Sequence, residues 1–269
     1  MKKIGFVAAS LAVVLSLSCS QVPLTGRNQL SLVNDSELEN AAVQQYNQFL
    51  SENKGKIISS GNNAQMVSRV GQRIANAVTK YMNSQGLGSR VKDYKWQFTL
   101  IQNDEKNAWC MPGGKVAVYS GILPVTQTEA GLAVVMGHEI AHAVARHSNE
   151  RYSQAMVAQG VGAVAGAAVT KSQAGQQVFQ QLYGIGAQGA VLLPNSRRQE
   201  SEADRLGLIF MAIAGYDPDV AVSFWQRMAA SKGEGNAPPE FLSTHPSDQR
   251  RISDIQARLP EAKKYYTSN

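Results

Sequence analysis

Residues 138–142 read H-E-I-A-H, and their types and spacing could support metal chemistry. On an α-helix, His138 and His142 lie one turn apart on the same face, where two neutral imidazoles can bind one zinc ion. Glu139 lies beside them, where a carboxylate can take a proton from a metal-bound water. The alternative is a pair of core histidines that share helical spacing by chance. The metal site is favoured because the chain has only 4 histidines and three fall within residues 138–147.

A catalytic zinc site needs a third protein ligand and an open position for water. The best candidate is Glu200, inside a second apolar helical pattern from about residue 197 to 214. Asp204 shares its face one turn on, which suits a carboxylate that accepts the outer ring N–H of a ligand histidine. Glu202 points roughly 200° away from Glu200. We therefore predict Glu200 as the third ligand of one zinc ion, and Glu202 as a solvated or ion-paired helix carboxylate.

Four segments of the chain resemble a known family. They are N-A-W-C-M-P-G-G-K-V-A-V-Y-S-G-I-L, H-E-I-A-H-A-V-A-R-H, S-R-R-Q-E-S-E-A-D-R-L-G and S-T-H-P-S-D-Q-R-R-I. Their order resembles that of the HtpX/BepA/LoiP group of zinc metallopeptidases, which are gluzincins related to CAAX prenyl endopeptidases and Oma-type proteases. The similarity covers about residues 35–258 and is closest to the bacterial envelope lipoproteins of the group. It implies His138, His142 and Glu200 as zinc ligands and Glu139 as the general base.

Further site residues follow from this resemblance. His245, in T-H-P, is the candidate that stabilises the oxyanion; in relatives such a histidine also reaches the metal and holds the enzyme latent. The alternative is an ordinary loop histidine. Arg251 is predicted to support the oxyanion, and His147, about 140° round from the second zinc histidine, to be structural. Asn107 and Ala108 would lie on an edge strand that pairs with an extended peptide.

The predicted function is hydrolysis of peptide bonds in unfolded or misassembled envelope proteins by a metal-activated water. The partners are then polypeptides bound in extended form, because edge-strand pairing recognises an extended backbone more than side chains. Two alternatives stay open. One is a chaperone-like factor for outer-membrane protein assembly with latent or secondary protease activity. The other is a catalytically idle zinc scaffold, against which the intact Glu139 argues.

The N-terminus has the pattern of an export signal over residues 1–18. Two lysines precede an apolar stretch, which is shorter than the roughly 20 residues a membrane anchor needs. Cys19 follows directly and resembles the lipidated first residue of a mature lipoprotein, facing the periplasm from the outer membrane. Residues 19–34 would be an extended, lipidated tether. Cys110 would then have no disulfide partner and is predicted to be a buried hydrophobic residue.

Length and composition agree with a single domain over residues 35–269. A chain of 269 residues with 43% hydrophobic content can bury one substantial core. The formal net charge of +6 is mildly basic. Basic residues occur in pairs, without long runs or interleaved aromatic residues. Nucleic acid is therefore not expected as a partner.

The predicted architecture is α+β, a mainly helical gluzincin-type domain whose small sheet has an edge strand beside the zinc cleft. Thr126 and Glu129 are predicted to form a capping box at the start of the zinc helix. Residues 157–193, rich in small apolar residues and glutamine, could be packed core, a mobile lid over the cleft, or a surface that rests on lipid or a partner, and the sequence does not decide between these. The other predicted elements are helices over about 36–53, 64–83, 218–231 and 247–258, and strands over 96–101 and 115–119 with a turn at 112–114 before the second strand.

Overall fold

The computed structural model describes residues 19–22, 24–158, 172–183, 196–231, 239–245 and 249–267. Its α-helices are α2 (Asp35–Glu52), α3 (Asn62–Ser84), α4 (Leu123–Thr126), α5 (Glu129–Val144), α6 (His147–Ala158), α7 (Gln173–Tyr183), α8 (Arg197–Ile213), α9 (Val220–Ala230), α10 (Glu240–Thr244) and α11 (Gln249–Lys263). Short 3-10 helices are η1 (Lys54–Lys56), η2 (Gly88–Arg90) and η3 (Ser120–Ile122). The strands are β1 (Cys19–Gln21), β2 (Asn28–Leu30), β3 (Ile57–Ile58), β4 (Gln97–Ile101), β5 (Ala108–Met111) and β6 (Lys115–Tyr119). The predicted signal peptide lies outside the described residues.

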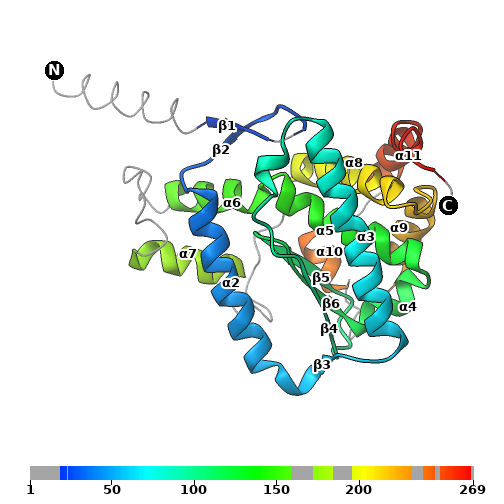
Figure 1. The fold of residues 1–269 in the computed structure, drawn as a ribbon, viewed down its shortest axis with the longest axis horizontal. Helices are drawn as coiled ribbons and strands as arrows, with labels where there is room; N and C mark the ends of the chain where they lie inside the picture. Colours follow the sequence, from blue (N-terminus) through cyan, green and yellow to red (C-terminus); the bar gives the residue numbers. More distant parts are fainter. Residues whose placement is uncertain are drawn as a thin grey trace.

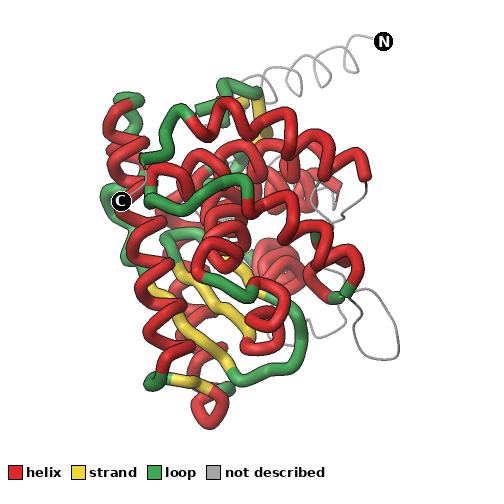
Figure 2. The backbone as a smooth tube through the Cα atoms, turned by 90° about the vertical axis from the view of Figure 1, so that its right-hand side faces the viewer, coloured by secondary structure: helices red, strands yellow, loops and turns green. Residues whose placement is uncertain are grey.

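The main sheet has four strands in the order β3-β4-β6-β5, seen among the helices in Figure 2. β4 and β6 are parallel, whereas β3 and β5 pair antiparallel with their neighbours. Gly113 and Gly114 have φ of 78° and 81°, a conformation that glycine adopts freely, and they allow the tight turn from β5 to β6. β5 therefore lies at an edge of the sheet. The sequence analysis recognised β4 and β6 from their alternation but did not assign a full strand to residues 108–111.

Helices cover both faces of the sheet, and Figure 1 shows α2 and α3 on opposite sides. Successive residues of β6 face opposite sides. Val116 and Val118 belong to the large core that includes side chains of α3, α5 and α8. Ala117 and Tyr119 instead pack in a second cluster with Phe49 of α2. This arrangement confirms the predicted α+β class, and it buries α5 between the sheet and α8.

The N-terminus of α5 differs from the predicted capping box. The N-cap is Thr128, whose side chain accepts a hydrogen bond from Gly131 N at 3.1 Å. Thr126 instead ends α4, and Gln127 between them has a positive φ of 63°. This break separates the two helices, so Thr126 cannot cap the zinc helix. The motif marked the right region but the wrong threonine.

Two glycines bring α5 and α8 into backbone contact. A Cβ atom on Gly207 would lie 2.9 Å from His138 N, and one on Gly137 would lie 2.9 Å from Gly207 O. Such distances are too short for real Cβ atoms. Because no side chain separates the helices here, Glu200 and Asp204 of α8 come within reach of the histidines on α5. The predicted zinc site therefore depends on two glycines that periodicity alone does not single out.

We predict that Gly207→Ala destabilises the fold by about 1–3 kcal/mol, because the new methyl group forces α5 and α8 apart. This loss should exceed the ~1 kcal/mol that alanine gains in helix propensity. Urea unfolding measures the change. Gly55→Ala is the matched control, since a Cβ atom at Gly55 meets nothing within 4 Å. Equal stability of the two variants would show that α5 and α8 tolerate a wider separation.

The N-terminal segment is not the extended tether that the sequence predicts. β1 and β2 form an antiparallel hairpin. Val22 between them is 1% exposed and belongs to the main core. Arg27 forms ion pairs with Glu150 at 2.6 Å and with Glu202 at 2.7 Å. The hairpin rests on contacts with residues more than a hundred positions away, which a local pattern does not reveal.

The helices predicted over about 36–53, 64–83, 218–231 and 247–258 are present as α2, α3, α9 and α11, with small shifts at their ends. α11 continues past Pro260 to Lys263, beyond its predicted end. Of the segment 157–193, α7 is described: Val178 and Phe179 pack with Tyr152 and Met156 of α6 in a satellite core. Residues 159–171 and 184–195, to which the prediction of a lid also applies, lie outside the described part of the chain. Among the described helices, none has the length and hydropathy needed to cross a bilayer.

Candidate metal centre

Four buried side chains converge between α5, α8 and the end of α10. His138 and His142 come from α5, Glu200 from the first turn of α8, and His245 directly follows α10. Each offers one potential ligand atom, and these atoms all lie within 4.8 Å of one another. The first three are the ligands predicted from the sequence. His245, predicted for the oxyanion or for a latent state, lies in the same cluster.

The spacing of these atoms fits one tetrahedral ion. His138 Nε2 is 3.0 Å from His142 Nε2 and 3.1 Å from His245 Nδ1. Glu200 Oε1 is 3.3 Å from His142 Nε2 and 3.0 Å from His245 Nδ1. A tetrahedral zinc site with bonds of ~2.0 Å has ligand-to-ligand distances of ~3.3 Å. The donor set of imidazole and carboxylate groups also suits zinc.

The charges of the cluster favour a cation. Burial by itself would lower the pKa of His138, but the carboxylates of Glu200 and Asp204 raise this pKa to about 9. Burial lowers the pKa of His142 well below its usual value, despite Glu200. Burial opposes ionisation of Glu200, yet His245 and His138 hold its pKa well below the usual range. The site therefore combines an ionised carboxylate with buried imidazoles, and a zinc ion requires these imidazoles in the neutral form.

Buried oxygens also lack hydrogen-bond donors in this cluster. Among the described residues, neither Glu139 Oε1 nor Glu200 Oε2 accepts a hydrogen bond. Arg251 Nη1 does lie 2.9 Å from Glu200 Oε2, as an ion pair outside hydrogen-bond geometry. Buried polar atoms without partners are costly. A bound metal would supply the missing interaction for Glu200.

Glu139 lies at the edge of this cluster, next to His245. Its Oε1 atom is 3.3 Å from His245 Nε2, and the residue is 4% exposed. Burial raises the pKa of Glu139 above its usual value. A carboxylate whose pKa is moved toward neutrality is a more effective proton acceptor at physiological pH. The structure thus brings the predicted base to the edge of the predicted metal site.

Asp204 lies behind His138, where the sequence predicts it, and Arg251 contacts Asp204. Asp204 Oδ1 is 2.9 Å from His138 Nδ1, the nitrogen that faces away from the cluster. Arg251 donates two hydrogen bonds to Asp204, at 2.9 and 2.8 Å. Its guanidinium also stacks 3.6 Å over the ring of Trp225. Arg251 therefore holds the carboxylate of Asp204 behind His138, and its predicted support of the oxyanion stays a prediction.

His147 lies outside the ligand cluster, in agreement with the prediction, but it makes a contact that helical periodicity does not predict. Its Nδ1 atom is 2.7 Å from His142 Nδ1, so it contacts a ligand although an ideal helix would turn it away. The reason is Arg146, whose φ of 62° breaks the helix between α5 and α6. Helical periodicity fails across such a break. The other ring nitrogen of His147 lies 3.2 Å from Glu202, on the helix of Glu200, and no sequence signal predicts either contact.

The predicted substrate strand lies at the edge of the sheet beside α5. Ala108 is the first residue of β5 and is 1% exposed, while Asn107 precedes the strand. Asn107 O accepts a hydrogen bond from Tyr119 N of β6 at 3.0 Å. Next to it, Lys106 O accepts one from Phe241 N of α10 at 3.2 Å. The segment that carries His245 is therefore attached to the chain beside the predicted substrate strand.

Comparison with known proteins identifies the family of this site. The sequence model of peptidase family M48 matches residues 66–259, which contain α5, α8 and α11. The chain belongs to peptidase family M48. This confirms the resemblance stated from the sequence and supports a zinc cofactor. The four-residue cluster is a group that could hold the metal.

Named relatives of this M48 protein come from mitochondria and from bacteria. It is 36% identical over 242 residues to the mitochondrial metalloendopeptidase OMA1 of Schizosaccharomyces pombe, covering 90% of this chain and 66% of the relative. The OMA1 of Saccharomyces cerevisiae is 36% identical over 184 residues, 66% of this chain and 51% of the relative. The beta-barrel assembly-enhancing protease of Escherichia coli is 32% identical over 190 residues, 67% of this chain and 39% of the relative. The matched region thus spans less than two thirds of each relative.

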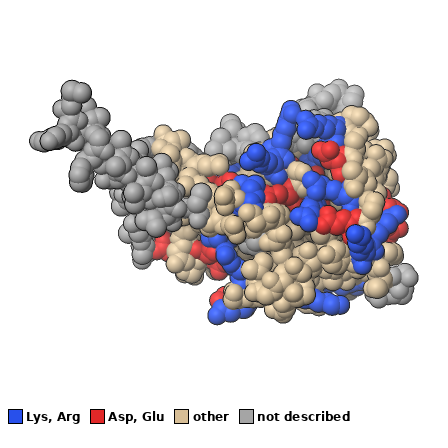
Figure 3. Space-filling model, turned by 90° about the horizontal axis from the view of Figure 1, so that it is seen from above, with Lys and Arg blue, Asp and Glu red and all other residues tan. Residues whose placement is uncertain are grey.

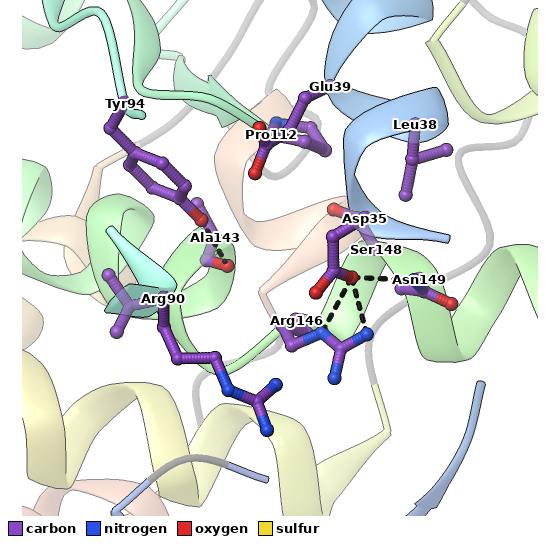
Figure 4. A pocket seen from close by; sticks show the side chains of 11 residues that line it. Asp35, Leu38, Glu39, Arg90, Tyr94, Pro112, Ala143, Arg146, Ser148 and Asn149 are labelled. Atoms are coloured by element: carbon purple, nitrogen blue, oxygen red, sulfur yellow. Dashed lines mark hydrogen bonds and ion pairs between the residues drawn. The ribbon is translucent and has the colours of Figure 1, made fainter. Parts of the chain in front are cut away.

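A separate pocket lies behind the end of α5, away from the cluster. Figure 4 shows Glu39 of α2 directed toward Pro112, and Tyr94 donating a hydrogen bond to the carbonyl of Ala143 at 3.3 Å. Burial, with the nearby carboxylates of Asp35 and Asp93, raises the pKa of Glu39 to about 7. Among the described residues, the group of side chains that could hold a metal ion does not include Glu39. On the face seen from above, Lys and Arg side chains are interleaved with Asp and Glu side chains (Figure 3).

Proposed function

We propose that this M48 protein is a zinc-dependent endopeptidase that hydrolyses unfolded or misassembled polypeptides. The observation that carries the proposal is the convergence of four buried ligand atoms within 4.8 Å with Glu139 at their edge. His138, His142 and Glu200 would hold the zinc ion. When bound, the ion supplies Lewis acidity that activates water and polarises the substrate carbonyl.

The remaining chemistry falls to side chains of the chain itself. Glu139 accepts the proton of the attacking water on its carboxylate and returns it to the leaving nitrogen of the cleaved peptide bond. The tetrahedral intermediate carries a negative oxygen that needs hydrogen-bond donors. His245 would provide one such donor after it leaves the ligand cluster. Arg251 donates a hydrogen bond to Asp204. Asp204 in turn contacts Nδ1 of His138 and thereby orients the His138 ring.

The substrate is proposed to bind in extended form along β5. An edge strand offers backbone groups for pairing, so recognition depends on an unfolded or stalled chain more than on its side chains. Asn107 and Ala108 would begin this contact. The name of the Escherichia coli relative, a beta-barrel assembly-enhancing protease, supports outer-membrane proteins or their assembly machinery as partners. It also keeps a chaperone-like role with latent proteolysis as the second candidate function.

The location is proposed from the N-terminal sequence. A signal over residues 1–18 would export the chain, and lipid on Cys19 would anchor it in the bacterial envelope, facing the periplasm and most simply at the outer membrane. The bacterial relatives agree with this proposal, whereas the OMA1 relatives are named mitochondrial. A boundary at residue 18 remains part of the same proposal, whereas the packing of Val22 in the main core argues against a boundary at residue 34. The hairpin described above places the first folded contacts close to Cys19.

We predict that the purified chain binds one zinc ion and that Glu200→Ala loses it together with casein cleavage. The reason is that a catalytic zinc site requires three protein ligands. Elemental analysis after gel filtration gives the stoichiometry, and removal and return of zinc should abolish and restore cleavage. Glu261→Gln is the control, because it removes a surface carboxylate that pairs with Arg205. Stoichiometric zinc in Glu200→Ala would overturn the ligand assignment.

A further inference from the structure

The outer nitrogen of His142 faces a second histidine instead of a carboxylate. Its Nε2 atom lies in the ligand cluster, 3.0 Å from His138 Nε2, whereas its Nδ1 atom is 2.7 Å from His147 Nδ1. A ligand nitrogen must be unprotonated. The neutral His142 ring then carries its proton on Nδ1 and donates it to His147. His147 is completely buried, so water cannot replace this acceptor.

The chain of contacts continues from His147 to Glu202. If His147 Nδ1 accepts, its own proton is on Nε2, and this nitrogen lies 3.2 Å from Glu202 Oε2. One tautomer of each ring therefore satisfies every contact in order. Metal-bound histidines usually donate directly to a carboxylate or carbonyl. Here an imidazole is inserted between the ligand and its carboxylate.

Glu202 is held in turn by the N-terminal hairpin. Arg27 Nε donates to Glu202 Oε2 at 2.7 Å, and Thr25 donates to its other oxygen. The remaining guanidinium nitrogens of Arg27 donate to both oxygens of Glu150, at 2.7 and 2.6 Å. Gln199 also donates to Glu150, at 2.8 Å, so this carboxylate is fixed as well. Arg27 therefore has a fixed position between two carboxylates.

The hairpin itself has a defined conformation around Arg27. Arg27 O accepts a hydrogen bond from Val22 N at 2.7 Å, and Gly26 N donates to Val22 O at 3.0 Å. Val22 is packed in the main core. These contacts bring Arg27 toward α6 and α8 rather than toward solvent, and its side chain is only 18% exposed.

Each of the two histidines proposed to bind zinc is contacted by further side chains at the ring nitrogen that faces away from the ligand cluster. His138 is backed by Asp204 and Arg251, which lie within the region that matches the family. His142 is backed by His147, Glu202 and Arg27, and Arg27 lies outside residues 66–259.

We propose that His147, Glu202 and Arg27 form one positioning chain for His142, through which the N-terminal hairpin completes the metal site. This proposal rests on the proposed zinc function. It assigns Glu202, which the sequence suggests is a plain ion-paired carboxylate, an indirect role in metal binding. It also joins the metal site to the segment that directly follows Cys19. Detachment of the hairpin would then weaken zinc binding at a distance from the ligands.

The test is zinc affinity in the full chain, measured by competition with a chromogenic chelator. Loss of the partner of a metal-bound histidine typically costs 10–100-fold in metal affinity. We expect a weakening in this range for His147→Phe and Glu202→Gln, and a weakening of at least several-fold for Arg27→Met, with recovery in Arg27→Lys. Arg205→Met is the matched control, since it removes another ion pair of α8, with Glu261 at 2.7 Å, that does not reach the ligands.

Two further measurements separate positioning from general destabilisation. The melting temperature of each zinc-free variant shows whether the fold persists. If His147→Phe does not fold, the zinc affinity of Glu202→Gln alone is compared with that of the wild type. The double variant His147→Phe/Glu202→Gln should bind zinc as tightly as His147→Phe alone. The reason is that the losses of zinc affinity are not additive when one residue acts on the metal site through the other. Cobalt substitution should give an altered visible spectrum in the variants, since it reports the ligand geometry.

The outcomes distinguish this inference from the function on which it rests. Zinc binding by the wild type, with Glu202→Gln and Arg27→Met equal to Arg205→Met, would overturn the positioning chain and leave the peptidase proposal intact. Full additivity of the double variant would also overturn it, because the residues would then act separately. Absence of zinc binding in the wild type would instead overturn the proposed function, and the positioning chain with it.

Discussion

Replacement of Glu139 by glutamine should lower casein cleavage by about 10²–10⁴-fold, the usual contribution of general acid–base catalysis. Glutamine keeps the shape of the side chain, but its amide cannot take a proton from water at neutral pH. The ligand atoms come from His138, His142, Glu200 and His245, so zinc content and fold should stay unchanged. The measurements are the turnover number and the zinc content of the same preparation.

The buried position of Glu139 makes a matched control necessary. Glu129→Gln is suitable because Glu129 lies on the same helix and pairs with Arg69 at the surface, away from the cluster. This variant should keep full activity. Near wild-type turnover in Glu139→Gln would remove Glu139 from the mechanism. Loss of zinc in Glu139→Gln would show instead that Glu139 supports the metal site.

The sequence was sufficient where the interaction is local. The spacing of His138 and His142 gives their common helix face, and the same rule relates Glu200 to Asp204 on the second helix. Alternation predicts β4 and β6 because one face of each strand meets α2 and the other meets α3 or α5. These features depend on the spacing of residues within a single helix or strand, and that spacing can be read directly from the sequence.

The sequence was insufficient where a backbone break or a distant contact decides the geometry. A positive φ at Arg146 redirects His147 onto His142, and no periodic pattern predicts such a break. The closeness of α5 and α8 depends on Gly137 facing Gly207, two residues that carry no side-chain signal of their own. The N-terminal hairpin was missed because its support is Glu150 and Glu202, far along the chain. In these three cases, a contact between segments decides the geometry.

His245 has two sets of contacts that together favour a closed resting state. Its Nδ1 atom lies 3.1 Å from His138 Nε2 and 3.0 Å from Glu200 Oε1, in the fourth position of the tetrahedral cluster. The segment that carries His245 is hydrogen-bonded to the chain just before β5, because Phe241 N donates to Lys106 O at 3.2 Å. An imidazole in the fourth position excludes water, and α10 covers the chain beside β5. We propose that this state is latent and that substrate entry requires α10 to move.

Removal of this imidazole should therefore have two opposed effects. In His245→Ala, a small zinc ligand such as 1,10-phenanthroline should bind faster, because the fourth position is open at rest. Casein cleavage should nevertheless be slower, because the displaced imidazole would otherwise donate to the negative oxygen of the intermediate. One such donor is worth up to ~3 kcal/mol, or about 10²-fold in turnover. Stopped-flow chelation and steady-state turnover measure the two effects separately.

The pattern of the two rates decides between three roles for His245. Thr244→Val is the control, because it changes the neighbouring residue of α10 and keeps the imidazole. Faster chelation with slower cleavage supports a residue that blocks the metal at rest and serves the oxyanion during turnover. Faster chelation with faster cleavage would leave only the blocking role, since no transition-state contact would then be lost. Rates equal to wild type in both assays would make His245 an ordinary loop residue, in spite of its place among the ligand atoms.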